Sequence, residues 1–144
     1  MPRPQLYLAS TSPRRGELLA QIGVCIEVVP QNVPENRLDG ESPELYVQRL
    51  ALEKACFGLK NMGSKVSLPV LGADTAVVVD NTVLGKPKDK ADAVAMLQLL
   101  SARSHRVLSA VAVVGRDNLG QDRETVRVSE SIVRFSPISV KECE

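Results

Sequence analysis

Residues 107–114 read VLSAVAVV, and every position in this run except Ser109 is apolar. A run of this kind is typical of a strand that is buried on both faces of a sheet. The chain contains only two Tyr, two Phe and no Trp, so its core must be built from aliphatic side chains. Together these features favour a sheet covered by helices over a small β-barrel.

Capping residues mark where the expected helices begin. Ser12-Pro13 and Ser42-Pro43 each pair a favoured N-cap residue with proline at the first helical position, and Asp89 is a third N-cap. Apolar periodicity extends these helices to about residues 22, 59 and 100, and Gly23 suits the end of the first one. The first helix should bury a stripe formed by Leu18, Leu19 and Ile22.

Short apolar runs between these helices predict the strands. A polar connector is expected at residues 61–67 and a hairpin turn at Asp80-Asn81, while the run at 125–132 alternates as a strand with one wet face does. This order predicts one α/β domain with a mixed, twisted sheet flanked by helices. The expected strands are residues 6–9, 25–29, 68–71, 76–79, 82–84, 107–114 and 125–132.

Composition argues against several classes of function. The net charge is +1, which provides no general basic field for a nucleic-acid partner. No stretch approaches the roughly 18 apolar residues that a membrane span requires, and the start of the chain lacks the pattern of a signal peptide. Cys25, Cys56 and Cys143 have no metal-binding spacing and are expected to be free thiols. We therefore expect a cytoplasmic protein.

The stretch ASTSPRRGELL, residues 9–19, concentrates hydroxyl and guanidinium groups where a strand gives way to a helix. Ser10, Thr11 and Ser12 supply hydroxyl donors, Arg14 and Arg15 supply cationic donors, and the helix start adds free N–H groups. This combination can form a phosphate cradle. A serine that caps the helix beside two solvated arginines accounts for the stretch equally well.

Other candidate residues are more ambiguous when each is taken alone. Asp74, in GADT, separates two expected strands, and a carboxylate in such a place is a metal ligand, a proton acceptor or a turn residue. Lys86 precedes Pro87 and so does not belong to a Walker A loop. Glu35 in a loop and Lys54 on a helix could each be an ordinary solvent-exposed side chain. His105, the single histidine, is expected to be structural.

Taken together, the candidate residues belong to a series of motifs that covers nearly the whole chain. This series closely resembles the Maf family of nucleoside triphosphate pyrophosphatases, once named for inhibition of septum formation. The resemblance implies a Maf/ITPase-like domain over residues 1–144 with a nucleotide cleft, and it allows a homodimer. The motifs are LASTSPRR (8–15), Glu35, RLALEKA (49–55), LGADT (71–75), LGKP (84–87) and MLQLLSARSHRV (96–107).

The resemblance also implies a reaction and a set of site residues. Maf-like enzymes hydrolyse a nucleoside triphosphate between the α- and β-phosphates, which gives the monophosphate and pyrophosphate. Asp74 would be the proton acceptor, and Glu35 with Asp74 would place a divalent metal, Mg²⁺ or Mn²⁺. Nucleoside triphosphate is then the expected partner, without nucleic acid or membrane. The residues implied to bind phosphate are Ser10, Ser12, Arg14, Arg15, Lys54 and Lys86.

Two positions separate subgroups of this family by substrate. They correspond here to Arg14 and Thr75, a pairing that resembles the dTTP/UTP pyrophosphatases, which remove surplus or non-standard nucleotides. The subgroup acting on 7-methyl-GTP has an aromatic residue and a longer amide at these places. That activity, and a non-catalytic role in nucleotide binding or cell division, are the alternatives.

The sequence departs from the family pattern in three respects. Ala102 replaces a glycine that is usual in the family, which is tolerable if its φ is negative, and Ser109 replaces a threonine. The chain ends at Glu144, in what resembles the acidic start of a helix. Family members continue with further core elements and a glutamine that contributes to specificity, so the domain is short at its C-terminal side by comparison.

Overall fold

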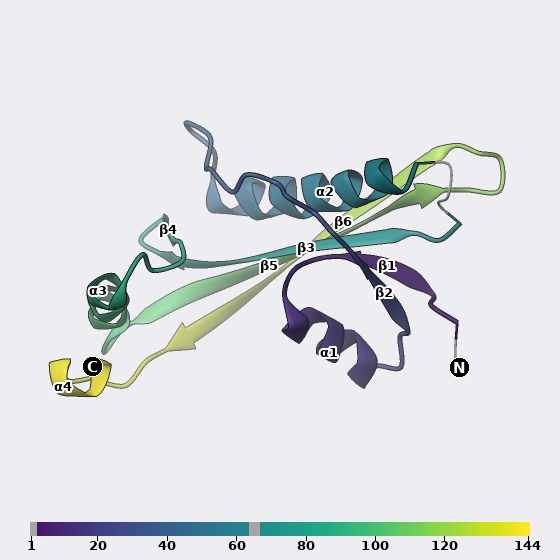
Figure 1. Ribbon diagram of the computed structural model, residues 1–144. Helices are drawn as coiled ribbons and strands as arrows, with labels where there is room; N and C mark the ends of the chain where they lie inside the picture. The colour runs from purple at the N-terminus through teal and green to yellow at the C-terminus, as the bar shows by residue number, and fades with distance from the viewer. Residues whose placement is uncertain (1–2, 64–66) are drawn as a thin grey trace.

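The computed structural model describes residues 3–63 and 67–144, so part of the connector expected at 61–67 lies outside the described residues. A strongly twisted mixed sheet forms the centre of the molecule, with α2 on one face and α1 on the other (Figure 1). The elements are β1 (Leu6–Ala9), α1 (Pro13–Gln21), β2 (Ile26–Val29), α2 (Pro43–Met62), β3 (Val70–Val79), β4 (Thr82–Leu84), α3 (Lys90–Leu100), β5 (Ser104–Arg116), β6 (Asp122–Arg134) and α4 (Val140–Cys143).

The sheet has the order β2-β1-β3-β5-β6, and β4 pairs with β3 outside this path. β2, β1 and β3 are parallel, whereas β4, β5 and β6 join by antiparallel pairing. β5 occupies one edge of β3 from Val70 to Val78. On the other edge, β1 pairs with residues 70–71 and β4 with residues 77–79. In the described chain, this edge therefore has no strand partner over residues 72–76, the segment that contains Asp74.

The helix α2 packs unusually close to β3 at Gly72. A Cβ on Gly72 would lie 2.3 Å from the backbone oxygen of Ala51 and 2.5 Å from the backbone nitrogen of Ala55. Ala51 and Ala55 are fully buried, as are Val47 and Leu50 on the same helix. These small residues let the α2 backbone pack directly on β3. The close packing holds Lys54, which immediately precedes Ala55 on α2, against the sheet.

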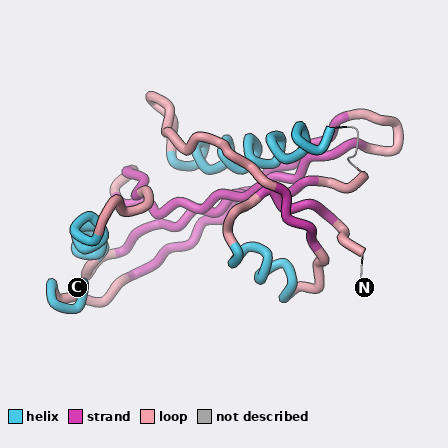
Figure 2. The backbone as a smooth tube through the Cα atoms, viewed as in Figure 1, coloured by secondary structure: helices cyan, strands magenta, loops and turns pink. Residues whose placement is uncertain are grey.

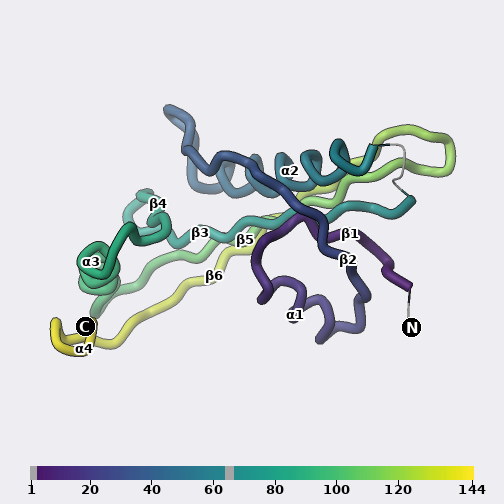
Figure 3. Tube along the Cα trace, in the orientation of Figure 1, coloured from purple at the N-terminus to yellow at the C-terminus, as the bar shows by residue number. Residues whose placement is uncertain are grey.

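Local signals predicted most of the element boundaries. Ser42 caps α2 by accepting from the Leu45 N–H at 3.2 Å, and Asp89 caps α3 by accepting from the Asp92 N–H at 2.8 Å. Asp80 and Asn81 have φ values of 49° and 63°, as a tight hairpin turn requires. Ser139 and Glu142 form a capping box, so the chain does end in a short helix. Figure 3 shows this helix, α4, beside α3.

Long-range packing overturned the expectation that residues 72–75 interrupt a strand. β3 runs without a break from Val70 to Val79. Gly72 lies within the strand because α2 leaves no room there for a side chain, and Asp74 is tolerated because α2 supplies a cationic partner. In the sequence, a glycine and an acid indicate a turn. Here both lie within a strand, because α2 packs against Gly72 and pairs with Asp74 through Lys54.

The expected burial of β5 and β6 was also wrong. In β5, Leu108 and Ala110 are fully buried beneath α2, whereas Val111 on the opposite face is 39% exposed. All residues of β6 are described, and none is buried: Val126 and Val133 are half-buried, and the other residues are exposed. Among the described elements, α2 covers only one face of β5, which explains the exposure of Val111. β6 is the edge strand next to β5 and lies beyond most of the contact with α2.

α1 begins at Pro13 with Ser12 at its N-cap, as expected, but the capping hydrogen bond and the burial of the apolar stripe differ from expectation. Within residues 3–63 and 67–144, the Ser12 side chain accepts no capping hydrogen bond. The Ser12 N–H donates to the Ser10 hydroxyl at 3.1 Å. Leu18 and Ile22 are 46% and 74% exposed, because no described element packs on that side of the helix.

No helix in the described part of the chain is long and apolar enough to cross a membrane.

Candidate functional site

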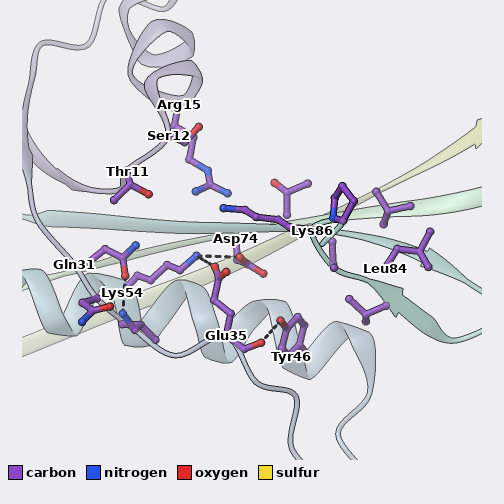
Figure 4. A pocket seen from close by; sticks show the side chains of 18 of the residues that line it. Thr11, Ser12, Arg15, Gln31, Glu35, Tyr46, Lys54, Asp74, Leu84 and Lys86 are labelled. Atoms are coloured by element: carbon purple, nitrogen blue, oxygen red, sulfur yellow. Dashed lines mark hydrogen bonds and ion pairs between the residues drawn. The ribbon is translucent and has the colours of Figure 1, made fainter. Parts of the chain in front are cut away.

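A cavity of about 800 Å³ opens where the edge of β3 has no strand partner (Figure 4). Its walls come from the start of α1, the β2–α2 loop, α2, the middle of β3 and the loop after β4. The lining residues are Thr11, Ser12, Pro13, Arg15, Gln31, Asn32, Val33, Glu35, Tyr46, Lys54, Asp74, Thr75, Ala76, Val77, Val83, Leu84, Gly85, Lys86 and Pro87.

One buried ammonium group joins two carboxylates at the base of the cavity. Lys54 Nζ donates to Glu35 Oε1 at 2.8 Å and to Asp74 Oδ1 at 3.1 Å. The side chains of Lys54 and Asp74 are only 4% and 9% exposed, whereas that of Glu35 is 47% exposed. Buried charges are tolerated only when they are paired. The pairing of Lys54 with the two carboxylates therefore explains how Lys54 and Asp74 can be buried.

The two carboxylates respond differently to their shared partner. The hydrogen bond from Lys54 lowers the pKa of Glu35, and the charges of Lys54, Lys86 and Arg15 act in the same direction. Burial raises the pKa of Asp74, even though Lys54 opposes this shift. Glu35 is consequently the more readily ionised of the two carboxyl groups, and Asp74 is the more basic one.

Cationic groups face these carboxylates from across the cavity. Figure 4 shows Arg15 and Lys86 reaching toward Asp74, one from α1 and the other from the loop after β4. Arg15 Nη1 donates to the Ser10 hydroxyl at 3.3 Å, which ties the guanidinium to the start of α1. An anion that enters the cavity would meet Arg15, Lys86 and the N–H groups of the helix start.

The structure brings most of the predicted site residues together. Ser12, Arg15, Glu35, Lys54, Asp74, Thr75 and Lys86 all line the cavity. Ser10 is buried, 3% exposed, and supports Arg15 rather than lining the cavity wall. Arg14 is exposed on α1 and is not among the lining residues. The roles expected of Ser10, of Arg14 and of the residues that line the cavity all stay predictions.

Sequence reasoning missed three polar residues of the cavity wall. Gln31 and Asn32 follow β2 directly after Pro30, and polar side chains that follow a parallel strand often face a ligand at the edge of an α/β sheet. Tyr46 stands in the first turn of α2 and donates its hydroxyl to the Glu35 carbonyl at 2.7 Å. The scarcity of aromatic residues in this chain was the signal that could have drawn attention to Tyr46.

Glu35 and Asp74 are suited to a hard divalent cation. Mg²⁺ is usually held by one or two carboxylates together with water and substrate phosphates, so a complete cage of protein ligands is not required. Among the described residues, no group of three or more His, Cys, Asp or Glu side chains is placed to hold a metal. The donor set therefore fits a metal that binds together with a phosphorylated ligand.

The fold and the cavity define an α/β protein with acidic and cationic groups facing one another at an open sheet edge. Residues 5–144 match the Maf-like protein family, and the chain belongs to that family. A dTTP/UTP pyrophosphatase of Saccharophagus degradans is 51% identical over 135 residues, 93% of this chain and 62% of the relative. Another from Alkalilimnicola ehrlichii is 46% identical, over 99% of this chain and 69% of the relative.

The chain therefore spans about two thirds of the length of these relatives. Among solved structures, the Staphylococcus aureus Ham1 protein is similar in fold, with a TM-score of 0.50. The two chains are 14% identical, and the match covers 87% of this chain and 69% of the other. This likeness agrees with the predicted Maf/ITPase-like architecture.

Proposed function

We propose that this chain is a nucleoside triphosphate pyrophosphatase that acts on dTTP and UTP, yielding the monophosphate and pyrophosphate. The observation that carries the proposal is the Lys54 ammonium shared by Asp74 and Glu35, in a cavity that Arg15 and Lys86 face from the other side. Membership of the Maf family and relatives named dTTP/UTP pyrophosphatases support the choice of reaction.

The residues divide the reaction between them. Asp74 accepts a proton from a water molecule while the water oxygen forms a bond to phosphorus and the bridging P–O bond breaks, so that pyrophosphate leaves. Arg15 and Lys86 neutralise the triphosphate oxygens, and Lys54 lies between the two carboxylates where it can reach a phosphate. Glu35 and Asp74 would hold Mg²⁺ or Mn²⁺, which would supply further positive charge to the phosphate oxygens.

Selection of a pyrimidine base is assigned to Arg14 and Thr75 by the family pattern. Thr75 lines the cavity, and its hydroxyl lies 3.3 Å from that of Ser109 on β5. Phosphate contacts from Ser10, Ser12 and Arg14 belong to the same proposal. We also propose a cytoplasmic role in removing surplus or non-standard nucleotides, with a homodimer as the form to test.

A comparison of substrates tests this proposal. The purified chain is incubated with dTTP, UTP or 7-methyl-GTP, with Mg²⁺ or with a chelator, and the nucleotide and phosphate products are separated. We expect monophosphate and pyrophosphate from dTTP and UTP, with metal required. Preference for 7-methyl-GTP would overturn the subgroup, and release of single phosphates would overturn the reaction. Binding of dTTP without turnover, while the Saccharophagus degradans relative is active in parallel, would favour the non-catalytic alternative.

A further inference from the structure

The loop between β2 and α2 carries Glu35, and α2 holds the backbone of that loop at two consecutive residues. The Tyr46 hydroxyl donates to the Glu35 carbonyl at 2.7 Å, and Arg49 Nη2 donates to the Asn36 carbonyl at 2.8 Å. Figure 2 shows the loop running beside α2 without a helix or strand of its own around Glu35. The loop therefore depends on side chains of α2 for its position near Glu35.

Arg49 is itself held in place. Its Nε donates to Glu41 Oε2 at 2.6 Å and its Nη2 to Glu41 Oε1 at 3.0 Å, a two-pronged ion pair that fixes the plane of the guanidinium. The guanidinium carbon also lies 5.8 Å from the centre of the Tyr46 ring. We call Tyr46, Arg49 and Glu41 the latch.

The electrostatics of the latch agree with its geometry. The hydrogen bond from Arg49 lowers the pKa of Glu41, whose side chain is 9% exposed, so the carboxylate stays charged. Burial raises the pKa of Tyr46, so its hydroxyl remains a donor. Tyr46 and Arg49 are three residues apart on α2 and hence neighbours on the helix surface.

The latch acts on a side chain that has little else to hold it. The Glu35 carboxylate is 47% exposed and meets Lys54 Nζ at 2.8 Å. Lys54 belongs to the same helix as Tyr46 and Arg49, so α2 holds this part of the loop both by its backbone and by the Glu35 carboxylate. If the backbone contacts are lost, the exposed Glu35 side chain is free to turn toward solvent.

We propose that Tyr46 and Arg49 are positioning residues, which with Glu41 hold the Glu35 carboxylate beside Asp74 so that the two can bind a divalent cation together. The proposal rests on the proposed function for its choice of ligand. None of the latch residues is required to touch the cation. Their effect on it passes entirely through the position of Glu35.

Tyr46→Phe tests the latch with the loss of a single oxygen atom, and Arg49→Lys keeps the charge but not the two-pronged geometry. Glu53→Gln is the matched control, because Glu53 contacts the same guanidinium at 3.2 Å without contacting the loop. Mn²⁺ binding is measured by electron paramagnetic resonance in the presence of a dTTP analogue with a methylene group between the α- and β-phosphorus atoms.

We expect the dissociation constant for Mn²⁺ to rise roughly tenfold in Tyr46→Phe and Arg49→Lys, as when an outer support of a metal ligand is removed. Glu53→Gln should stay within about twofold of the unchanged chain. The KM for dTTP should change far less than the Mg²⁺ concentration that gives half-maximal activity. Thermal unfolding of Tyr46→Phe provides the check on folding, because that variant keeps the aromatic ring.

A double-mutant cycle separates positioning from a general structural effect. In a Glu35→Gln background, Tyr46→Phe should have almost no further effect on Mn²⁺ affinity, because the group that it positions is already removed. Equal effects of Tyr46→Phe in both backgrounds would overturn the proposal, as would unchanged Mn²⁺ affinity in Tyr46→Phe and Arg49→Lys. If the cycle behaves as expected but no nucleotide is hydrolysed, the latch stands and the proposed pyrophosphatase function fails.

Discussion

Charged side chains are buried in the candidate site but exposed on the β5–β6 hairpin. In the site, Lys54 and Asp74 are almost fully buried between α2 and β3, where they meet at 3.1 Å. Along β6 the charged side chains are exposed, and an ion pair such as Arg116–Asp122 at 3.4 Å joins side chains that are 59% and 84% exposed. Burial strengthens electrostatic interactions and requires each charge to be paired. The same residue types are thus buried and paired in one region and exposed to solvent in the other.

Replacing one aspartate in each region should give the largest difference in activity between the two regions. Asp74→Asn removes the proposed proton acceptor and should lower kcat about 10³-fold, within the range known for general bases. Asp122→Asn on β6 should leave kcat unchanged, because Asp122 lies outside the cavity. Release of pyrophosphate from dTTP, followed over time, measures both variants. An active Asp74→Asn variant would show that another group accepts the proton.

The pH dependence of the reaction sharpens the same point. Asp74 must be ionised to accept a proton, and burial raises its pKa above the usual aspartate value of 3.8. Activity should therefore fall with decreasing pH through a pKa above that value, while the lowered pKa of Glu35 keeps that group ionised over the same range. A profile of kcat/KM against pH measures the midpoint. A midpoint at or below the ordinary value would contradict the effect of burial on Asp74.

The two regions should also respond differently to an added methyl group. Gly72→Ala must push α2 away from β3, because the new Cβ meets backbone at 2.3 Å and 2.5 Å. The free energy of unfolding should drop by about 3 kcal/mol, as in severe overpacking, and activity should be lost with the position of Lys54. Gly115→Ala, near the end of β5, is the matched control, since its Cβ would lie an ordinary 3.4 Å from Pro69.

Urea unfolding of both glycine variants measures the difference. Gly115→Ala should change the free energy of unfolding by less than about 1 kcal/mol. Equal stability of the two variants would mean that contact between α2 and β3 is looser than the structure shows.

The smallest effect is expected outside the site, where α3 leads into the hairpin. Ala102 has φ of 58°, so the condition under which alanine would be tolerated here, a negative φ, is not met. Because the left-handed region strains alanine and suits glycine, Ala102→Gly should raise the free energy of unfolding by about 1 kcal/mol without changing kcat. Ala95→Gly, at an exposed position within α3, should lower it by a similar amount. A destabilised Ala102→Gly variant would contradict the argument.

Prediction from sequence was strongest for contacts between near neighbours. Ser42 and Asp89 cap helices through residues only three positions away, and Asp80-Asn81 turns the chain within a hairpin. Ser12 also stands at the N-cap of α1 with Pro13 after it, but its side chain accepts no capping hydrogen bond, and the Ser10 hydroxyl accepts from the Ser12 N–H and from Arg15. The same Ser-Pro pattern therefore marked the start of both helices, but only Ser42 caps its helix with a side-chain hydrogen bond.

The sequence by itself determined the α/β order and, through its resemblance to the Maf family, a set of acidic and basic residues most of which do converge on one cavity. Tertiary structure alone decided that Gly72 and Asp74 lie within an unbroken strand, that Arg15 rather than Arg14 lines the cavity, and that Tyr46 and Arg49 hold the loop of Glu35. The physical reason is range. Caps and turns are settled within a few residues, whereas Lys54 meets Glu35 and Asp74 only because α2 packs on the sheet.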